Sequence, residues 1–179
     1  DAPLGLGGQS LWRQARLIVH FSHHSNTMKN ENLFAALRAA FPARLDDIAV
    51  ETDNGLCYSW RDLERASAMM ANLLGQLDIP PASRVAVQVE KSVEAMILYL
   101  ATLRAGHVFL PLNTAYQSAE IEYFIGNAEP AVVFCSGANH GWVSKIAFKA
   151  GTRHVFTLND NRTGTLLDRA AAQSDRHTP

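Results

Sequence analysis

The stretch from Arg84 to Asn113 constrains the fold most, because it reads as a strand, a helix and a second strand in succession. Val85 to Val89 is largely apolar and β-branched, which is typical of a buried strand. Ser92 can cap the following helix, and Gly106 can end that helix in a left-handed conformation. His107 to Leu110 forms the second apolar run. The helix between the runs carries one apolar stripe, made of Val93, Met96, Ile97, Leu100 and Leu103.

Two strands that are apolar throughout predict a parallel βαβ unit in a sheet covered on both faces. Asp53-Asn54-Gly55 between extended segments predicts a hairpin, since both Asn and Gly tolerate positive φ. The rest of the chain alternates helices with short apolar strands. The sequence therefore predicts a doubly wound α/β fold with a mostly parallel sheet and a small β-hairpin. The further elements expected are helices over 32–41, 59–76, 118–128, 142–150 and 166–172, and strands over 48–52, 56–59, 131–135 and 154–158.

Two motifs resemble the core motifs of the adenylate-forming enzymes, which include acyl-CoA synthetases, peptide-synthetase adenylation domains and luciferases. YSWRDL, at Tyr58 to Leu63, resembles their first core motif, and LRAGHVFLPLN, at Leu103 to Asn113, resembles their second. The similarity continues through EKSVEAMILYLATLRAG, LPLNTAY and EIEYFIGNAEP, so it extends from about Met28 to Ala172. Within the family the run most resembles the malonyl-CoA synthetases.

This resemblance implies an ATP-dependent acyl-CoA synthetase that uses Mg²⁺ and coenzyme A, with malonate or a similar carboxylate as substrate. The 179 residues then form the N-terminal part of the large AMP-binding domain. The family's Gly/Ser/Thr-rich phosphate loop and its mobile C-terminal domain lie beyond the matched region. We therefore expect a fragment that is inactive by itself, with no catalytic, cofactor-binding or metal-binding residue of its own.

Several polar turns are candidates to replace the phosphate loop. Asn161 to Thr165 has hydroxyls and one glycine before a helix, but it lacks a lysine, and a cap explains it better. Glu90-Lys91-Ser92 follows a strand at the edge where open α/β sheets bind ligands, yet it has no glycine to admit a phosphate. We interpret both as turns and caps, and the same holds for Ser136 to Asn139 and for Asn113, Thr114 and Tyr116.

The cysteines and histidines suggest no nucleophile or metal site. Cys57 and Cys135 fall in apolar strands, and we expect both to be inert packing residues. The cluster of His20, His23 and His24 invites a metal interpretation, but no carboxylate or thiol lies nearby to complete the ligand set. A Gly-x-Gly-x-x-Gly motif follows none of the predicted strands, which argues against a dinucleotide-binding domain.

The chain divides into three parts. Residues 1–27 differ from the family-like text and are expected to be a disordered leader or a non-native extension. Residues 28–172 form the partial AMP-binding domain, and residues 173–179 are a polar tail. An Arg-containing, acid-poor leader leaves mitochondrial targeting as an alternative to the cytoplasm, where two distant cysteines are expected to stay reduced.

The charge composition limits the classes of binding partner that we expect for this chain. The net charge of −1, from 16 basic and 17 acidic residues, indicates neither nucleic acid nor an anionic membrane. Small-molecule substrates remain the expected partners of the complete enzyme. A fragment would expose apolar surface meant for missing parts, so we expect it to self-associate. The alternative is a small stand-alone α/β domain that binds a partner without catalysis and unfolds cooperatively as a monomer.

Overall fold

The computed structural model describes residues 31–178, and a four-stranded parallel sheet lies at its centre. The strand order is β4-β3-β5-β6, so the chain moves from β3 to one side and then crosses to the other. This confirms the predicted doubly wound fold. The strands are β3 (Arg84–Gln88), β4 (Val108–Pro111), β5 (Val132–Cys135) and β6 (His154–Thr157).

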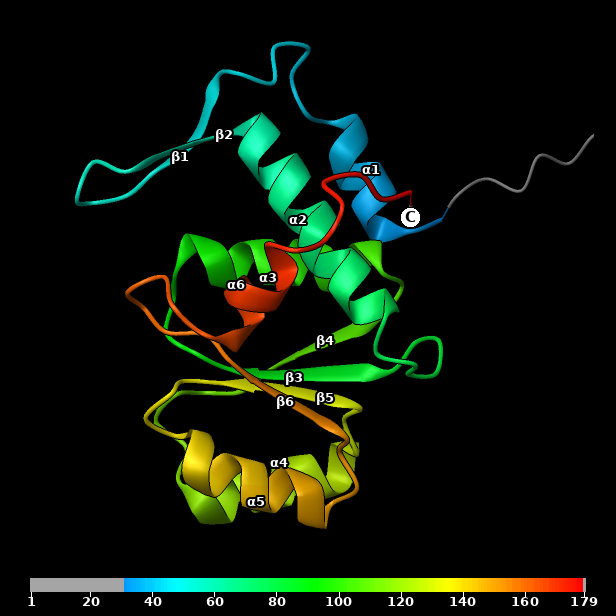
Figure 1. Cartoon of the computed structure of the whole chain (residues 1–179), viewed down its shortest axis with the longest axis vertical. Coiled ribbons are helices and arrows are strands. Elements are labelled where there is room, and N and C mark those ends of the chain that lie inside the picture. Colours follow the sequence, from blue (N-terminus) through cyan, green and yellow to red (C-terminus); the bar gives the residue numbers. More distant parts are fainter. Residues whose placement is uncertain (1–30, 179) are drawn as a thin grey trace, which may run out of the picture.

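Helices cover both faces of this sheet (Figure 1). Three of them, α2, α3 and α6, pack on one face, and α4 and α5 lie side by side on the other. The short α1 and the hairpin formed by β1 and β2 extend the first of these layers. The bounds are α1 (Leu33–Ala39), β1 (Ile48–Glu51), β2 (Cys57–Ser59), α2 (Trp60–Gly75), α3 (Val93–Arg104), α4 (Ser118–Ala128), α5 (His140–Lys149) and α6 (Thr165–Ala170).

The central strand β3 separates two hydrophobic cores. Val85 and Val87 face α2, α3 and α6, whereas Ala86 between them belongs to the core under α4 and α5. Strand side chains alternate between faces, so a strand with both faces covered must be apolar at every position. Val85, Ala86 and Val87 are indeed at most 4% exposed. The unbroken apolar run in the sequence has this physical origin.

Local capping fixes the ends of the two longest helices. The Ser59 hydroxyl accepts a hydrogen bond from the Asp62 amide, and the Asp62 carboxylate accepts one from the Ser59 amide. Ser92 Oγ accepts a hydrogen bond from the Ala95 amide, as predicted. Gly106 follows α3 with a φ of 73°, in the left-handed region predicted for it. Each cap satisfies backbone groups that a helix end leaves unpaired.

Two local details differ from the sequence prediction. Ser118, the predicted helix cap, is the first helical residue. Gln117 occupies the cap position, and its backbone amide donates a hydrogen bond to the Glu120 carboxylate. Of the hairpin pair Asn54-Gly55, only Gly55 adopts a positive φ. The Asn54 side chain instead accepts a hydrogen bond from the Thr52 hydroxyl, at 2.5 Å, and this closes the turn without a left-handed asparagine.

The first helix buries only part of its apolar side chains. Phe34 is 1% exposed, but Leu33 and Leu37 are 52% and 37% exposed. Helix α1 lies at the outside of the α3 layer, so only part of its surface meets another element. The predicted leader and the histidines at positions 20, 23 and 24 lie outside the described residues.

The predicted polar tail, residues 173–179, has no helix or strand over its described part, but side chains hold it against α2. Asn72 Nδ2 donates hydrogen bonds to the carbonyl oxygens of Ser174 and Arg176, at 2.8 and 2.9 Å. Two more side chains fix this segment: Arg65 pairs with Asp175, and Arg104 donates to the His177 carbonyl. Among residues 31–178, no helix has both the length and the apolar character that a membrane span requires.

Candidate functional site

The carboxyl edge of the sheet gathers the loops that follow all four parallel strands. Doubly wound sheets bind ligands at this edge, at the point where the strand order reverses, which here lies between β3 and β5. The hairpin of β1 and β2 lies over the same α2–α3 layer (Figure 1). Residues from this edge and from the hairpin meet in one polar cluster.

The cluster consists of Tyr58 on β2, Glu94 in the first turn of α3 and Arg162 in the loop after β6. The Tyr58 hydroxyl donates a hydrogen bond to Glu94 Oε1 at 2.5 Å, and Arg162 Nε donates to the same oxygen at 3.0 Å. The Arg162 guanidinium carbon also lies 5.8 Å from the centre of the Tyr58 ring. Three segments distant in the sequence are therefore joined through one carboxylate oxygen.

Burial makes this carboxylate depend on its partners. Glu94 is 7% exposed, and a charge so far removed from water is costly unless it is paired. The amino end of α3 adds the favourable end of the helix dipole. Burial, followed by the hydrogen bond to Glu94, raises the pKa of Tyr58 to about 12, so the phenol stays protonated as the donor at neutral pH.

The loop that carries Arg162 contains two residues with positive φ angles. Arg162 has a φ of 62°, in the left-handed region that non-glycine residues seldom adopt. Gly164 has a φ of 135°, and a Cβ at this position would lie 2.4 Å from the Thr157 carbonyl oxygen. The loop therefore approaches β6 too closely for any other residue at position 164. Residues in such conformations persist where the surroundings fix them, and they cluster at functional sites.

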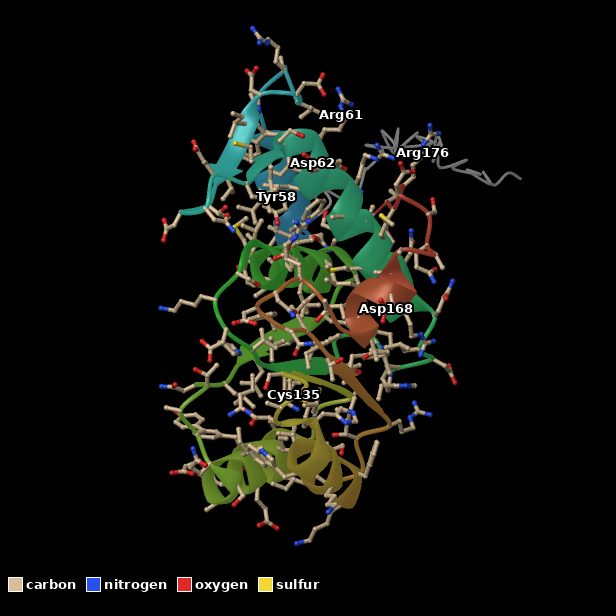
Figure 2. All side chains as sticks on the ribbon, turned by 60° about the vertical axis from the view of Figure 1, so that its left-hand side comes forward. Tyr58, Arg61, Asp62, Cys135, Asp168 and Arg176 are labelled. Atoms are coloured by element: carbon tan, nitrogen blue, oxygen red, sulfur yellow. The ribbon has the colours of Figure 1, made fainter. Side chains whose placement is uncertain are left out.

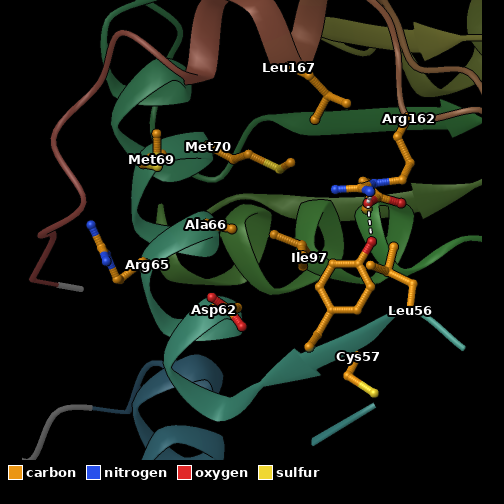
Figure 3. Close-up of a pocket in the computed structure, with 12 residues that line it drawn as sticks. Leu56, Cys57, Asp62, Arg65, Ala66, Met69, Met70, Ile97, Arg162 and Leu167 are labelled. Carbon is orange, nitrogen blue, oxygen red and sulfur yellow. Dashed lines mark hydrogen bonds and ion pairs between the residues drawn. The ribbon is translucent and has the colours of Figure 1, made fainter. Parts of the chain in front are cut away.

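Two adjoining cavities share this cluster. One, of about 500 Å³, lies between the hairpin, α2, α3 and α6, and Figure 3 shows its lining side chains. The other, of about 320 Å³, lies between the hairpin turn and the loops that follow β3 and β6. Leu56 and the three residues of the cluster line both cavities. The cluster thus forms part of the wall between an apolar cavity and a polar crevice.

The polar turns predicted as caps form hydrogen bonds within the chain, but neither α5 nor α6 has a side-chain cap from its turn. Thr163 Oγ1 donates to Asn161 Oδ1 at 2.6 Å, and the Thr165 amide donates to Thr157 Oγ1 at 2.9 Å. In the loop after β5, the Gly137 amide donates to Asn159 Oδ1 at 2.7 Å. These polar groups therefore stabilise the loops that follow β5 and β6.

The other two predicted turns differ in their surroundings. Asn113 Oδ1 accepts a hydrogen bond from the Ala115 amide, and Tyr116 stacks on Phe124, so both residues stabilise the loop after β4. Lys91 is exposed and lines the polar crevice together with Arg162. The crevice therefore brings together two of the sequence candidates, the turn at Lys91 and the loop at Arg162, which are far apart in the chain.

The prediction that both cysteines are packing residues is right for Cys135 and wrong for Cys57. Cys135 is fully buried in β5, and burial raises the pKa of its thiol to about 12, as expected for inert packing. Cys57 is exposed on β2. Its neighbour Tyr58 takes the inward position of this short strand, so Cys57 points to the opposite face. Figure 2 shows Cys135 within the sheet and Tyr58 between the hairpin and the helices.

In the sequence, Tyr58 stands out only as part of a motif, Glu94 only as a first-turn acid and Arg162 only as part of a loop. One signal was available, since Glu94 follows Val93 on a helix that is apolar around much of its circumference. Among residues 31–178, no group of three or more His, Cys, Asp or Glu side chains is arranged to hold a metal ion.

The fold and the position of these loops place the protein in the doubly wound α/β class, whose ligands bind outside the carboxyl ends of the strands. Within this class the chain belongs to the family of AMP-binding enzymes, because the model of that family matches residues 37–178. This assignment confirms the resemblance to adenylate-forming enzymes, and it does not favour the alternative of a stand-alone binding domain.

Solved structures agree with the assignment. The chain is similar to ATP-bound MatB from Rhodopseudomonas palustris, with 42% identity and a TM-score of 0.78, over 82% of this chain and 29% of MatB. It shares its fold with a benzoate CoA ligase from Burkholderia xenovorans LB400, at 22% identity and a TM-score of 0.70, over 80% of this chain and 29% of the ligase.

A curated relative points to the same family. Tyrocidine synthase 1 from Brevibacillus parabrevis is 31% identical over 101 residues, which cover 56% of this chain and 9% of that protein. The chain therefore spans a minor part of each of these three proteins.

Proposed function

We propose that this chain is the N-terminal part of an ATP-dependent acyl-CoA synthetase that activates malonate or a similar small carboxylate. In the first step a carboxylate oxygen attacks the α-phosphorus of ATP, which forms an acyl-adenylate and releases pyrophosphate. In the second step the coenzyme A thiolate attacks the acyl carbon, which forms the thioester and releases AMP. Both steps require Mg²⁺ or cationic side chains to stabilise charge on the phosphates.

One observation carries this proposal: the 42% identity to ATP-bound MatB over most of the described chain. The parallel sheet and both of its helical layers fall within the residues that match the AMP-binding family. The malonate branch is supported by the run through residues 90–106, 110–116 and 120–130, which within the family most resembles the malonyl-CoA synthetases.

The role proposed for the described residues is to support the site rather than to carry its chemistry. The turns after β5 and β6 use their polar groups within the chain, and α6 has only 6 residues, too short to offer a phosphate its amino end. We therefore expect no exchange of radioactive pyrophosphate into ATP by the 179-residue chain alone. Measurable exchange would contradict this assignment of roles.

A chimera tests the proposed function directly. Residues 31–178 would replace the matching segment of MatB from Rhodopseudomonas palustris, and pyrophosphate release would be followed with ATP, Mg²⁺, coenzyme A and malonate. We expect carboxylate-dependent release, because the segment supplies the same scaffold. Succinate and acetate in place of malonate would test the range of carboxylates accepted.

The matched control is the same chimera with Val87→Pro, which removes a backbone donor from the central strand and should abolish release. The proposal fails if the chimera folds, binds ATP as judged by thermal shift, and still releases no pyrophosphate with any of these carboxylates.

A further inference from the structure

The segment after α6, residues 173–178, crosses α2 and reaches α1 (Figure 1, red), and we call it the strap. It contains neither helix nor strand, and none of its residues is fully buried. Burial of apolar side chains therefore contributes little to its attachment, which depends on polar contacts.

Two side chains from the helices beneath hold the strap by its backbone. Asn72 Nδ2 on α2 donates hydrogen bonds to the carbonyl oxygens of residues 174 and 176, at 2.8 and 2.9 Å. Arg104 Nη2 on α3 donates to the carbonyl oxygen of His177. Each such bond contributes only a modest net free energy, so the strap can detach locally while the rest of the domain stays folded.

The ring of His177 favours docking only in its neutral form. Its Nδ1 atom is buried, and no described residue forms a hydrogen bond with it. Protonation places a hydrogen on both ring nitrogens, so an imidazolium here would bury an unpaired N–H together with a positive charge. A detached strap exposes the ring to water and removes both costs.

The charged groups that face His177 come from three helices and are Arg38 on α1, Glu64 on α2 and Arg104 on α3. Arg104 is 5% exposed, so its charge is poorly screened by water. Glu64 pairs with both arginines, which leaves two cations to share one acid. A further positive charge on the ring would therefore meet repulsion.

The other charges of the strap are more accessible to water. Asp175 pairs with Arg65 on α2 at 2.7 Å, with side chains that are 39% and 59% exposed, and Arg176 is exposed. Burial, followed by the charge of Arg104, lowers the pKa of His177 below its ordinary value of 6.5. The contribution of the ring to docking is thus fully present above pH 6.5 and is lost as the pH falls.

We propose that the strap is a pH-sensitive latch, which is docked on α2 and α3 while His177 is neutral and detaches when this ring takes up a proton. Detachment leaves Asn72 and Arg104 without three carbonyl acceptors, and it opens the surface of α2 that the strap covers. The proposal goes beyond the acyl-CoA synthetase function and does not rest on it.

The test follows the full 179-residue chain by ¹⁵N–¹H NMR as the pH is lowered from about 7.5 to about 5, the range in which histidine titrates. We expect the backbone amides of the strap and the side-chain NH₂ of Asn72 to shift together with the Cε1–H signal of His177. The midpoint should lie below pH 6.5. Signals from the strands of the parallel sheet should stay in place, because only the strap detaches.

Variants identify the group that titrates. His177→Gln keeps the carbonyl that Arg104 holds but cannot take up a proton in this range, so its strap should stay docked at every pH tested. His140→Gln, on α5 in the opposite helical layer, is the matched control and should respond like the wild type. Asn72→Ala removes two hydrogen bonds to the strap and should increase the detached fraction at each pH.

Strap signals that do not move over this range would overturn the proposal. A transition that persists in His177→Gln would do the same, because it would assign the titration to a carboxylate such as Asp175 or Glu64. A His177 pKa at or above 6.5 would show that docking favours the charged ring, and simultaneous shifts of the sheet strands would indicate unfolding of the domain instead of detachment. Either result would contradict the latch.

Discussion

Arg162 Nε lies 3.0 Å from Glu94 Oε1, although the two residues are 68 positions apart in the sequence. The glutamate side chain is 9% exposed, and the arginine side chain is 54% exposed. The pair therefore joins a buried acid on α3 to a cation that reaches in from a surface loop. The Tyr58 hydroxyl completes the arrangement from the hairpin, so three segments depend on this acid.

We expect Glu94→Gln to lower the free energy of unfolding by about 1–2 kcal/mol, because the amide is a weaker acceptor for both donors and leaves Arg162 without its counter-charge. Urea unfolding followed by circular dichroism measures the change. Glu122→Gln is the matched control, since this acid pairs with Lys149 on the surface and its loss should cost at most about 0.5 kcal/mol. Equal losses in the two variants would contradict a special role for Glu94.

Tyr58 should make stability depend on alkaline pH. The pKa of the folded phenol is about 12, whereas unfolded tyrosines ionise near 10. The contribution of the protonated phenol is therefore fully present below pH 10 and is lost as the pH rises from 10 to about 12.

The comparison with Tyr58→Phe isolates this contribution. At pH 8 the variant should be about 1 kcal/mol less stable than the wild type, because Glu94 loses a donor. The difference should shrink as urea unfolding is repeated at higher pH, toward 12. A difference that stays constant over this range would show that the hydroxyl does not titrate as expected.

Two glycines should respond oppositely to alanine. Gly164→Ala should destabilise by more than about 2 kcal/mol, because the new Cβ would meet the Thr157 carbonyl oxygen at 2.4 Å and φ is 135°. Gly126→Ala, within α4 and with open space around it, should stabilise by about 0.5–1 kcal/mol. Chemical unfolding of both variants tests the pair, and a neutral Gly164→Ala would mean that the loop does not approach β6 so closely.

The two cysteines should differ in reactivity. Cys57 is exposed, while the Cys135 thiol is buried with a pKa raised to about 12. Ellman's reagent should therefore label one thiol per folded chain and two in denaturant. The variant Cys57→Ser should show no rapid labelling until it unfolds. Rapid labelling of both thiols in the folded chain would contradict the burial of Cys135.

The strand–helix–strand core was predictable because its signals are local. Ser92 and Gly106 mark the ends of α3 through backbone hydrogen bonds and backbone conformation, which depend on adjacent residues. The apolar character of β3 on both faces likewise indicates a parallel strand before any neighbour is known. The doubly wound fold follows from such units in succession.

The candidate site was not predictable in the same way. Whether Cys57 or Tyr58 points inward on a three-residue strand depends on which face of the hairpin meets α2, and alternation alone leaves both choices open. The partner of Glu94 is likewise set by the position of the loop after β6. A contact between residues 68 positions apart leaves no periodic pattern in the sequence, so it could not be predicted from the sequence.

The pairing of Glu94 with Arg162 also bears on synthesis of the chain. Ribosomes add about 5–20 residues per second, so the 68 positions between the two residues correspond to roughly 3–14 s. During this interval the acid of α3 exists without its cation, and a lone buried carboxylate is costly. The amino end of α3 therefore cannot reach its final packing until the loop after β6 has left the ribosome.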